Sequence, residues 1–145
     1  MKTKALVLLL CIAIIASCLV AFTACNKDDD SKMLIAVVTD TDLMDEGFNQ
    51  NTYEGVKAYA EAHNCSYKHY QPDANNDDEA VMRKAVSDGA KVVIVLGSLQ
   101  ESALRTVASA NPGVKFVLFD GEEPLGLDNV AVVSFKEEES GFIAG

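Results

Sequence analysis

The stretch Leu34-Ile35-Ala36-Val37-Val38-Thr39-Asp40 decides the fold, because five apolar residues run without a polar break and are followed by Thr39 and the carboxylate of Asp40. A second run of this kind, Val92-Val93-Ile94-Val95-Leu96, ends at Gly97-Ser98. Uninterrupted β-branched runs are typical of strands covered on both faces, as in a parallel sheet with helices on either side. We therefore expect two central strands, each fully buried.

Helical and strand patterns alternate around these runs. Apolar residues recur every three or four positions in 48–63, which predicts an amphipathic helix, and 66–70 alternate as in a strand. Asn75–Asp78 supply cap chemistry for a helix that ends at Gly89, and a further helix follows Gly97-Ser98 and ends at Asn111-Pro112-Gly113. The stripes expected to face inward are Phe48, Thr52, Tyr53, Val56, Tyr59, Ala60 and His63; Val81, Met82, Ala85 and Val86; and Leu99, Ala103, Leu104, Val107 and Ala108.

The C-terminal part of the sequence completes an alternating pattern. Residues 114–119 and 130–133 predict two more strands, and Ser134-Phe135-Lys136-Glu137 has the form of a capping box that opens a last helix. The order βαβαβαββα is typical of an α/β, Rossmann-like parallel sheet with helices on both faces. Because the last helix reaches Gly145 without a stop signal, we expect a fragment or a truncated gene product whose remainder builds a second lobe.

Composition and charge exclude several classes of protein. The chain has 145 residues, of which 49% are hydrophobic and 23% charged, which suits about one globular domain and not a disordered chain. Its formal net charge is −10, with no run of Lys or Arg. A nucleic-acid partner is therefore not expected, because nothing in the sequence would neutralise a phosphate backbone.

The first 24 residues have the features of an export signal. Lys2 and Lys4 precede the apolar stretch 5–24, and Phe22-Thr23-Ala24-Cys25 resembles the lipobox of bacterial lipoproteins. We expect a signal peptide over 1–24, a diacylglycerol on Cys25, and a charged tether over 25–32 at the extracytoplasmic face of the cell membrane. Ile15-Ala16-Ser17-Cys18 fits the same pattern, but lipidation there would leave an apolar segment in water. An uncleaved anchor and soluble secretion stay open as alternatives.

Motifs for catalysis, cofactors and metals are missing from the sequence. Cys65 is the cysteine that remains once Cys11 and Cys18 are assigned to the signal and Cys25 to the lipid. Neither His63 nor His69 has a partner at metal-ligand spacing, so no metal site is expected. The glycine-rich loops of dinucleotide and phosphate binding and the serine elbow of esterases do not occur. A receiver-type phosphoacceptor conflicts with export, since its phosphate donors are cytoplasmic. The protein is therefore not expected to be an enzyme or to hold a cofactor.

The candidate binding residues follow the predicted strands. In an open parallel sheet, ligands bind outside the carboxyl ends of the strands, where Asp40, Gly97-Ser98 and Asp120 fall, and Phe48 and Asn49 begin a helix on the same rim. Carboxylates beside an aromatic face suit a neutral, flat, hydroxyl-bearing molecule such as a sugar or nucleoside. The alternative is that aspartates in such loops are turn or cap residues. We favour that for Asp42 and Asp45, and ligand binding for Asp40 and Asp120.

Several motifs carry a family resemblance over most of residues 33–145. The chain resembles the basic membrane protein family of substrate-binding lipoproteins, a group that includes purine nucleoside receptors of ABC importers. The motifs that carry the resemblance are Val37-Val38-Thr39-Asp40, Asp45-Glu46-Gly47-Phe48-Asn49-Gln50, Tyr53-Glu54-Gly55, Phe119-Asp120-Gly121 and Phe135-Lys136-Glu137-Glu138-Glu139-Ser140-Gly141-Phe142-Ile143-Ala144-Gly145.

The resemblance implies a type I periplasmic-binding fold of two lobes, of which residues 33–145 form the first. It implies that Asp40 and Asp120 hydrogen-bond the ligand, that Phe48 stacks on the base, and that Asn49 lines the site, with Gly97 and Ser98 as further candidates. The expected function is delivery of a nucleoside-like molecule to an ABC permease. A surface lipoprotein acting as a sensor or interaction protein, and a sugar or autoinducer ligand, remain alternatives.

Overall fold

The computed structural model describes residues 32–41, 43, 47–121 and 124–145, and Lys32–Gly145 form one compact unit. The predicted signal peptide, Cys25, the tether up to residue 31, Asp42 and Asp45 lie outside the described residues. The elements, in chain order, are β1 (Leu34–Thr39), α2 (Phe48–Ala62), β2 (Ser66–Tyr70), α3 (Asp78–Ser87), β3 (Ala90–Leu96), the 3-10 turn η1 (Ser98–Gln100), α4 (Glu101–Ala110), β4 (Lys115–Phe119), β5 (Val130–Val133) and α5 (Glu137–Ala144).

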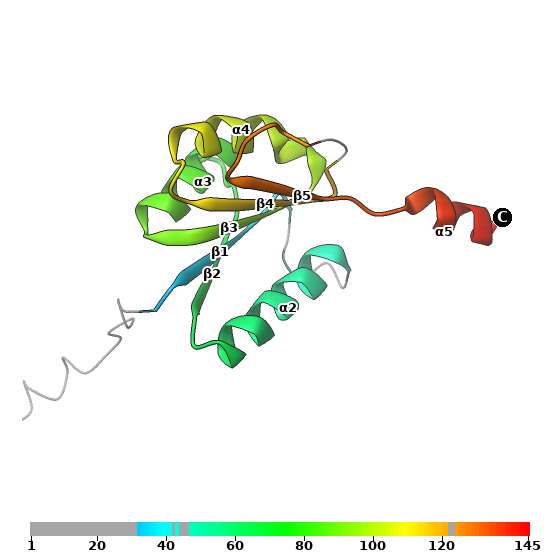
Figure 1. Ribbon diagram of the computed structural model, residues 1–145, viewed down its shortest axis with the longest axis horizontal. Helices are drawn as coiled ribbons and strands as arrows, with labels where there is room; N and C mark the ends of the chain where they lie inside the picture. The colour runs from blue at the N-terminus through cyan, green and yellow to red at the C-terminus, as the bar shows by residue number, and fades with distance from the viewer. Residues whose placement is uncertain (1–31, 42, 44–46, 122–123) are drawn as a thin grey trace, which may run out of the picture. The chain divides into compact units, whose positions relative to one another are not determined.

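The five strands form one parallel sheet in the order β2-β1-β3-β4-β5 (Figure 1). All four neighbouring pairs are parallel. The predicted α/β, Rossmann-like class is therefore confirmed, and the strand predictions for 66–70 and 130–133 match the observed bounds. Because every strand points the same way, the loops that follow the strands collect at one edge of the sheet.

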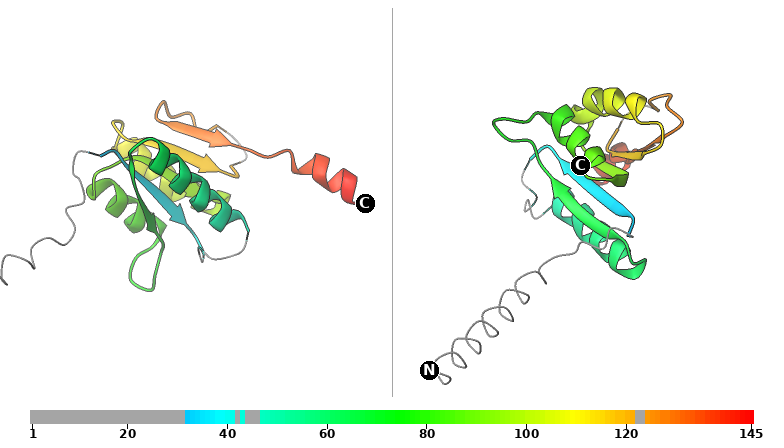
Figure 2. Two further views of the ribbon diagram at one scale, coloured as in Figure 1. Left: turned by 90° about the horizontal axis from the view of Figure 1, so that it is seen from below. Right: turned by 90° about the vertical axis from the view of Figure 1, so that its left-hand side faces the viewer.

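Helices cover both faces of the sheet, as predicted. Helices α3 and α4 lie on one face and α2 lies on the other (Figures 1 and 2). Beneath α3 and α4, the inward-facing residues of β3 and β4 are fully or almost fully buried, among them Val95, Phe116 and Leu118. On the α2 side, Ile35 and Val37 of β1 pack in a cluster with Val56 and Ala60.

The two central strands differ in how far they are buried. Residues Ile35–Thr39 of β1 are all buried, as predicted, whereas Leu34 at the start of the strand is half-buried. The prediction of full burial is wrong for β3, because Val92 and Ile94 are only half-buried. The physical reason is that α2 packs against β1 and β2, so that the α2-side residues of β3 have a helix on one flank only.

The predicted capping interactions are present at α3 and absent at α5. At the start of α3, the Asp77 carboxylate accepts a hydrogen bond from the Ala80 amide at 2.9 Å, and Gly89, with φ of 97°, follows the helix, as predicted. The predicted capping box at Ser134 is wrong. Helix α5 begins at Glu137, and the Ser134 hydroxyl instead donates to the Gly121 carbonyl at 2.6 Å.

Two predicted stripes are shifted on their helices. On α4, Leu104, Val107 and Ala108 are buried as predicted, but Leu99 is 85% exposed. Leu99 lies in η1, whose 3-10 turn is tighter than an α-helical turn and so rotates its side chains away from the directions that a continuous α-helix would give them. Gln100 therefore points into the interior, where its Nε2 donates to the Leu96 carbonyl at 2.8 Å. On α2, the buried residues are Asn49, Val56 and Ala60, whereas Tyr59 of the predicted stripe is 51% exposed.

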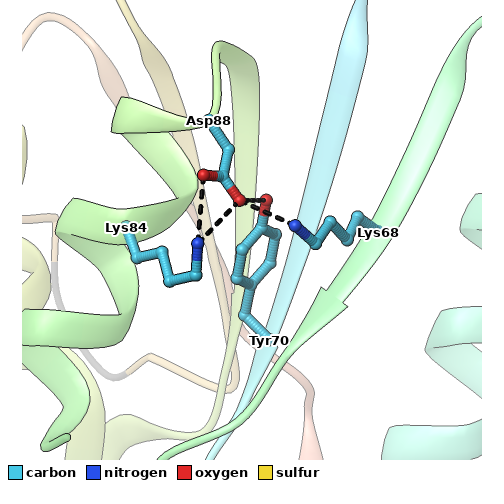
Figure 3. Close-up of polar contacts among 4 residues, drawn as sticks. All are labelled: Lys68, Tyr70, Lys84 and Asp88. Atoms are coloured by element: carbon cyan, nitrogen blue, oxygen red, sulfur yellow. Dashed lines mark hydrogen bonds and ion pairs between the residues drawn. The ribbon is translucent and has the colours of Figure 1, made fainter. Parts of the chain in front are cut away.

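A polar cluster joins the edge strand β2 to the end of α3 (Figure 3). The Asp88 carboxylate accepts hydrogen bonds from Lys68 at 2.7 Å, from Tyr70 at 2.9 Å and from Lys84 at 3.1 Å. The hydrogen bonds from Lys68 and Lys84 lower the pKa of Asp88 to about 2, and burial, followed by the bond to Asp88, raises the pKa of Tyr70 to about 12. The cluster therefore favours a charged Asp88 and a neutral Tyr70.

The C-terminal helix α5 carries apolar side chains in water. Phe142 and Ile143 are 89% and 85% exposed. In the part of the chain that the structure describes, no helix is both long and apolar enough to cross a membrane.

Candidate ligand-binding site

Three of the predicted binding positions follow three neighbouring strands. In the sheet register, Thr39 of β1 lies beside Leu96 of β3, and Leu96 lies beside Phe119 of β4. The next residues along the chain, Asp40, Gly97 and Asp120, therefore leave the same edge of the sheet side by side. Adjacent strands are about 4.8 Å apart, so the backbones of Asp40 and Asp120 are separated by roughly 10 Å, with that of Gly97 between them.

Gly97 provides a backbone position without a side chain beside Asp40. Its φ of 100° lies in the region that favours glycine, and a Cβ built there would be 3.7 Å from Oδ2 of Asp40. Asp40 itself is half-buried, and Ser98 is exposed at the start of η1. Oδ2 of Asp40 therefore lies close to the Gly97 backbone, with no side chain of residue 97 beside it.

A chain of hydrogen bonds connects Asp40 to the first turn of α2. The Asn49 side-chain amide donates from Nδ2 to the Thr41 hydroxyl at 3.0 Å, and the Thr41 hydroxyl donates to Oδ1 of Asp40 at 3.2 Å. Asn49 is 4% exposed, although it lies on the predicted binding rim. The structure thus brings Asp40 and Asn49 together through Thr41, a residue that the sequence analysis did not single out.

Phe48 presents its ring at the same rim. The side chain is 39% exposed, and its ring centroid lies 6.2 Å from that of Phe135, with the two ring planes at 86°. This edge-to-face arrangement is one that aromatic pairs prefer. Sequence reasoning did not assign Phe135 to the site, although its position two residues after the end of a strand was a usable signal.

Asp120 adopts an unusual backbone conformation. Its φ of 64° is in the left-handed region, which costs energy in most residues but is tolerated by Asp, and its amide donates to the Val133 carbonyl at 2.8 Å. The next residue must be glycine, because a Cβ at Gly121 would lie 2.6 Å from Cγ1 of Val132. The packing against β5 therefore holds the Asp120-Gly121 turn in place.

The rim is acidic beyond the residues predicted from sequence. Burial, followed by the charges of Asp40 and Asp77, raises the pKa of Asp78 at the start of α3. The sequence analysis placed Asp78 in the cap only, whereas the structure brings it within electrostatic reach of Asp40. Anionic ligands are disfavoured at a rim that carries these carboxylates.

No group of three or more His, Cys, Asp or Glu side chains that could hold a metal ion occurs among the described residues. Cys65, the free cysteine of the described part, lies between α2 and β2 and contacts the His63 carbonyl at 3.6 Å. What the rim offers chemically is hydrogen-bond acceptors and an aromatic surface.

Comparison with known proteins identifies the family. The family of PnrA-like ABC transporter substrate-binding proteins, Bmp, matches residues 32–145, so the chain belongs to this family. A relative from Lactococcus lactis subsp. cremoris (strain MG1363), the ABC transporter nucleoside-binding protein BmpA, is 28% identical over 115 residues, which are 76% of this chain and 32% of the relative. The chain thus spans about a third of that relative's length.

Solved structures support the fold. An ABC transporter solute-binding protein from Aeropyrum pernix K1 matches with a TM-score of 0.70 and 24% identity, over 77% of this chain and 31% of that one. A fragment of a predicted lipoprotein from Peptoclostridium difficile 630 matches with a TM-score of 0.63 and 19% identity, over 79% of this chain and 94% of that one. The predicted family and fold class are therefore both confirmed.

Proposed function

We propose that the protein is the extracytoplasmic binding component of an ABC importer and captures a neutral, nucleoside-like molecule at the rim formed by Asp40, Asn49 and Asp120. The ligand's flat ring stacks on Phe48, and its hydroxyl or amine groups donate to the carboxylates. The protein releases the ligand unchanged to a permease. The family is one of substrate-binding proteins, and the relative described above is named for nucleoside binding.

The observation that carries this proposal is the arrangement of Asp40, Gly97 and Asp120 at the ends of three adjacent strands, beside a half-exposed aromatic ring. Carboxylates accept hydrogen bonds only, so they select a ligand that supplies donors. The acidic rim, which includes Asp78, disfavours phosphorylated forms of the same molecule. Together these features favour a nucleoside over a nucleotide.

Two further parts of the proposal concern the rest of the protein. A second lobe closes over the rim and buries the other side of the ligand, as hinge closure does in binding proteins of this kind. Residues 1–24 direct export, and a lipid on Cys25 holds the protein at the outer face of the membrane through the tether 25–32. In this proposal the first lobe, residues 33–145, makes only part of the contacts with the ligand.

Titration of the isotope-labelled protein with inosine, monitored by NMR, tests the proposal. We expect resonances of Asp40, Phe48 and Asp120 to shift with a dissociation constant on the order of 0.1–1 mM, since one side of the ligand stays in water. Inosine monophosphate and glucose should cause smaller shifts. Replacement Phe48→Ala should weaken inosine binding roughly tenfold by removing the stacked ring.

Tyr59→Ala provides the matched control, because Tyr59 is an exposed aromatic residue on the same helix, more than two turns from the rim. This variant should bind inosine as the wild-type protein does. Shifts confined to residues remote from the rim, or equal binding by Phe48→Ala, would contradict the proposed site. Submicromolar binding of inosine would contradict the need for a second lobe.

A further inference from the structure

The Thr41 hydroxyl occupies a bridging position in the candidate site. It lies 3.0 Å from Nδ2 of Asn49 and 3.2 Å from Oδ1 of Asp40. Asp40 leaves the end of β1, whereas Asn49 belongs to the first turn of α2. Thr41 therefore connects two elements that each supply a proposed ligand contact.

The directions of these hydrogen bonds are determined by the groups involved. The Asn49 amide nitrogen can only donate, so the Thr41 oxygen accepts, and the single Thr41 hydroxyl proton is directed to the Asp40 carboxylate, which can only accept. The donor sequence runs from Asn49 through Thr41 to Asp40. Oδ1 of Asp40 is engaged in this way, and Oδ2 faces Gly97, whose Cβ position would be 3.7 Å away.

Thr39 and His69 fix the position of the Thr41 backbone through two further hydrogen bonds. The buried Thr39 hydroxyl donates to the Thr41 carbonyl at 2.8 Å. Because its only proton is used there, the same hydroxyl accepts a hydrogen bond from Nε2 of His69 on β2, at 2.9 Å. The position of Thr41 thus depends on β1 and β2, which are parts of the rigid sheet.

We infer that Thr41 is a positioning residue for ligand binding. This inference rests on the proposed function. By holding Oδ1 of Asp40 and the amide of Asn49 in one hydrogen-bonded unit, Thr41 orients the carboxylate so that Oδ2 receives a donor from the ligand on the Gly97 side. The ligand class that follows is a neutral molecule with a hydroxyl or amine donor at this point.

Two substitutions separate the hydroxyl from the shape of the side chain. Thr41→Val keeps the volume but can neither accept from Asn49 nor donate to Asp40, and Thr41→Ser keeps the hydroxyl. In the unliganded protein we expect Thr41→Val to move the Asn49 side-chain amide resonances and to speed their exchange with water, with Thr41→Ser close to wild type. Inosine binding should weaken about tenfold in Thr41→Val and less than threefold in Thr41→Ser.

The outcomes distinguish the inference from the function on which it rests. Unchanged Asn49 resonances in Thr41→Val would overturn the bridge, whatever the protein binds. Altered resonances with equal inosine binding by Thr41→Val and Thr41→Ser would overturn the positioning role alone. If the wild-type protein binds no inosine, the proposed function fails, and the positioning role fails with it.

Discussion

The Asp88 carboxylate, next to the end of α3, accepts hydrogen bonds from three side chains, two of which belong to β2 (Figure 3). Its side chain retains 25% of its accessible surface, and those of Lys68 and Lys84 retain 50% and 62%. Solvent screening at such exposure weakens ion pairs. We therefore expect the cluster to contribute about 1 kcal/mol to the free energy of unfolding, less than the lowered pKa of Asp88 alone would suggest. The contribution of Asp88 is modest but depends on pH.

We predict that Asp88→Asn lowers the free energy of unfolding by about 1 kcal/mol at pH 7 and by almost nothing near pH 2. The pKa of Asp88 is lowered in the folded protein from its usual 3.8 to about 2. The charged form therefore stabilises the fold fully above about pH 4, and this contribution is lost as the pH falls from about 4 to about 2. Urea unfolding of both proteins across this range measures the difference.

Glu54→Gln is the control for the Asp88 prediction. Glu54 pairs with Lys57 on α2 at 3.9 Å, with 56% and 40% of the two side chains exposed. Its removal should change the free energy of unfolding by less than about 0.5 kcal/mol at any pH. A difference between wild type and Asp88→Asn that stays constant from pH 7 to pH 2 would show that the carboxylate charge is not the cause.

At the scale of the elements, β3 has one face fully covered and one face half-covered. Val95 points toward α3 and α4 and is completely buried, whereas Val92 points toward the α2 side and is half-buried. Both are valines on the same strand, which makes them a matched pair. The difference in burial between the two side chains reflects how far helices cover each face of the strand.

We predict that Val95→Ala lowers the free energy of unfolding by about 2 kcal/mol, through lost burial and a cavity, and that Val92→Ala lowers it by less than about 1 kcal/mol. Chemical denaturation of the two variants under identical conditions is the measurement. Equal losses would mean that the α2-side face of β3 is covered as fully as the other face.

Element boundaries were predictable where local chemistry determines them. Asp77 caps α3 and Gly89 follows it because a carboxylate can bond exposed amides and glycine tolerates positive φ. The directions of the η1 side chains were not predictable from the sequence, since a short 3-10 turn changes which residue points inward and leaves no signature in the residue types. Gln100 is buried there and Leu99 is exposed, the reverse of what their polarity suggests.

For the whole molecule, the proposed lipid anchor can be tested in cells. We predict that Cys25→Ser moves the protein out of the membrane fraction and abolishes labelling with radioactive palmitate, because the proposal makes the Cys25 sulfur the lipid acceptor. Cys65→Ser is the control and should leave both unchanged, since Cys65 lies in the folded unit. Continued membrane association and labelling of Cys25→Ser would favour Cys18 as the acceptor, and membrane association without labelling would favour an uncleaved anchor.

The sequence by itself determined the fold class and the family. Two uninterrupted apolar runs, at 34–38 and 92–96, require a sheet covered by helices, and their spacing with the amphipathic segments leaves few alternatives to a parallel α/β arrangement. It also indicated where the proposed binding rim lies. The residue after a buried strand necessarily emerges at the carboxyl edge, so Asp40 and Asp120 could be selected from their positions alone.

Only the tertiary structure decided how the rim residues interact. Strand order makes β1, β3 and β4 neighbours, and this brings Gly97 beside Asp40. The contacts of Thr41 with Asn49 and of Phe135 with Phe48 join residues that are eight and 87 positions apart in the chain, and no local pattern encodes their separation in space. Contacts of this kind depend on the packing of whole elements, because each side chain meets its partner only after the sheet and helices are assembled.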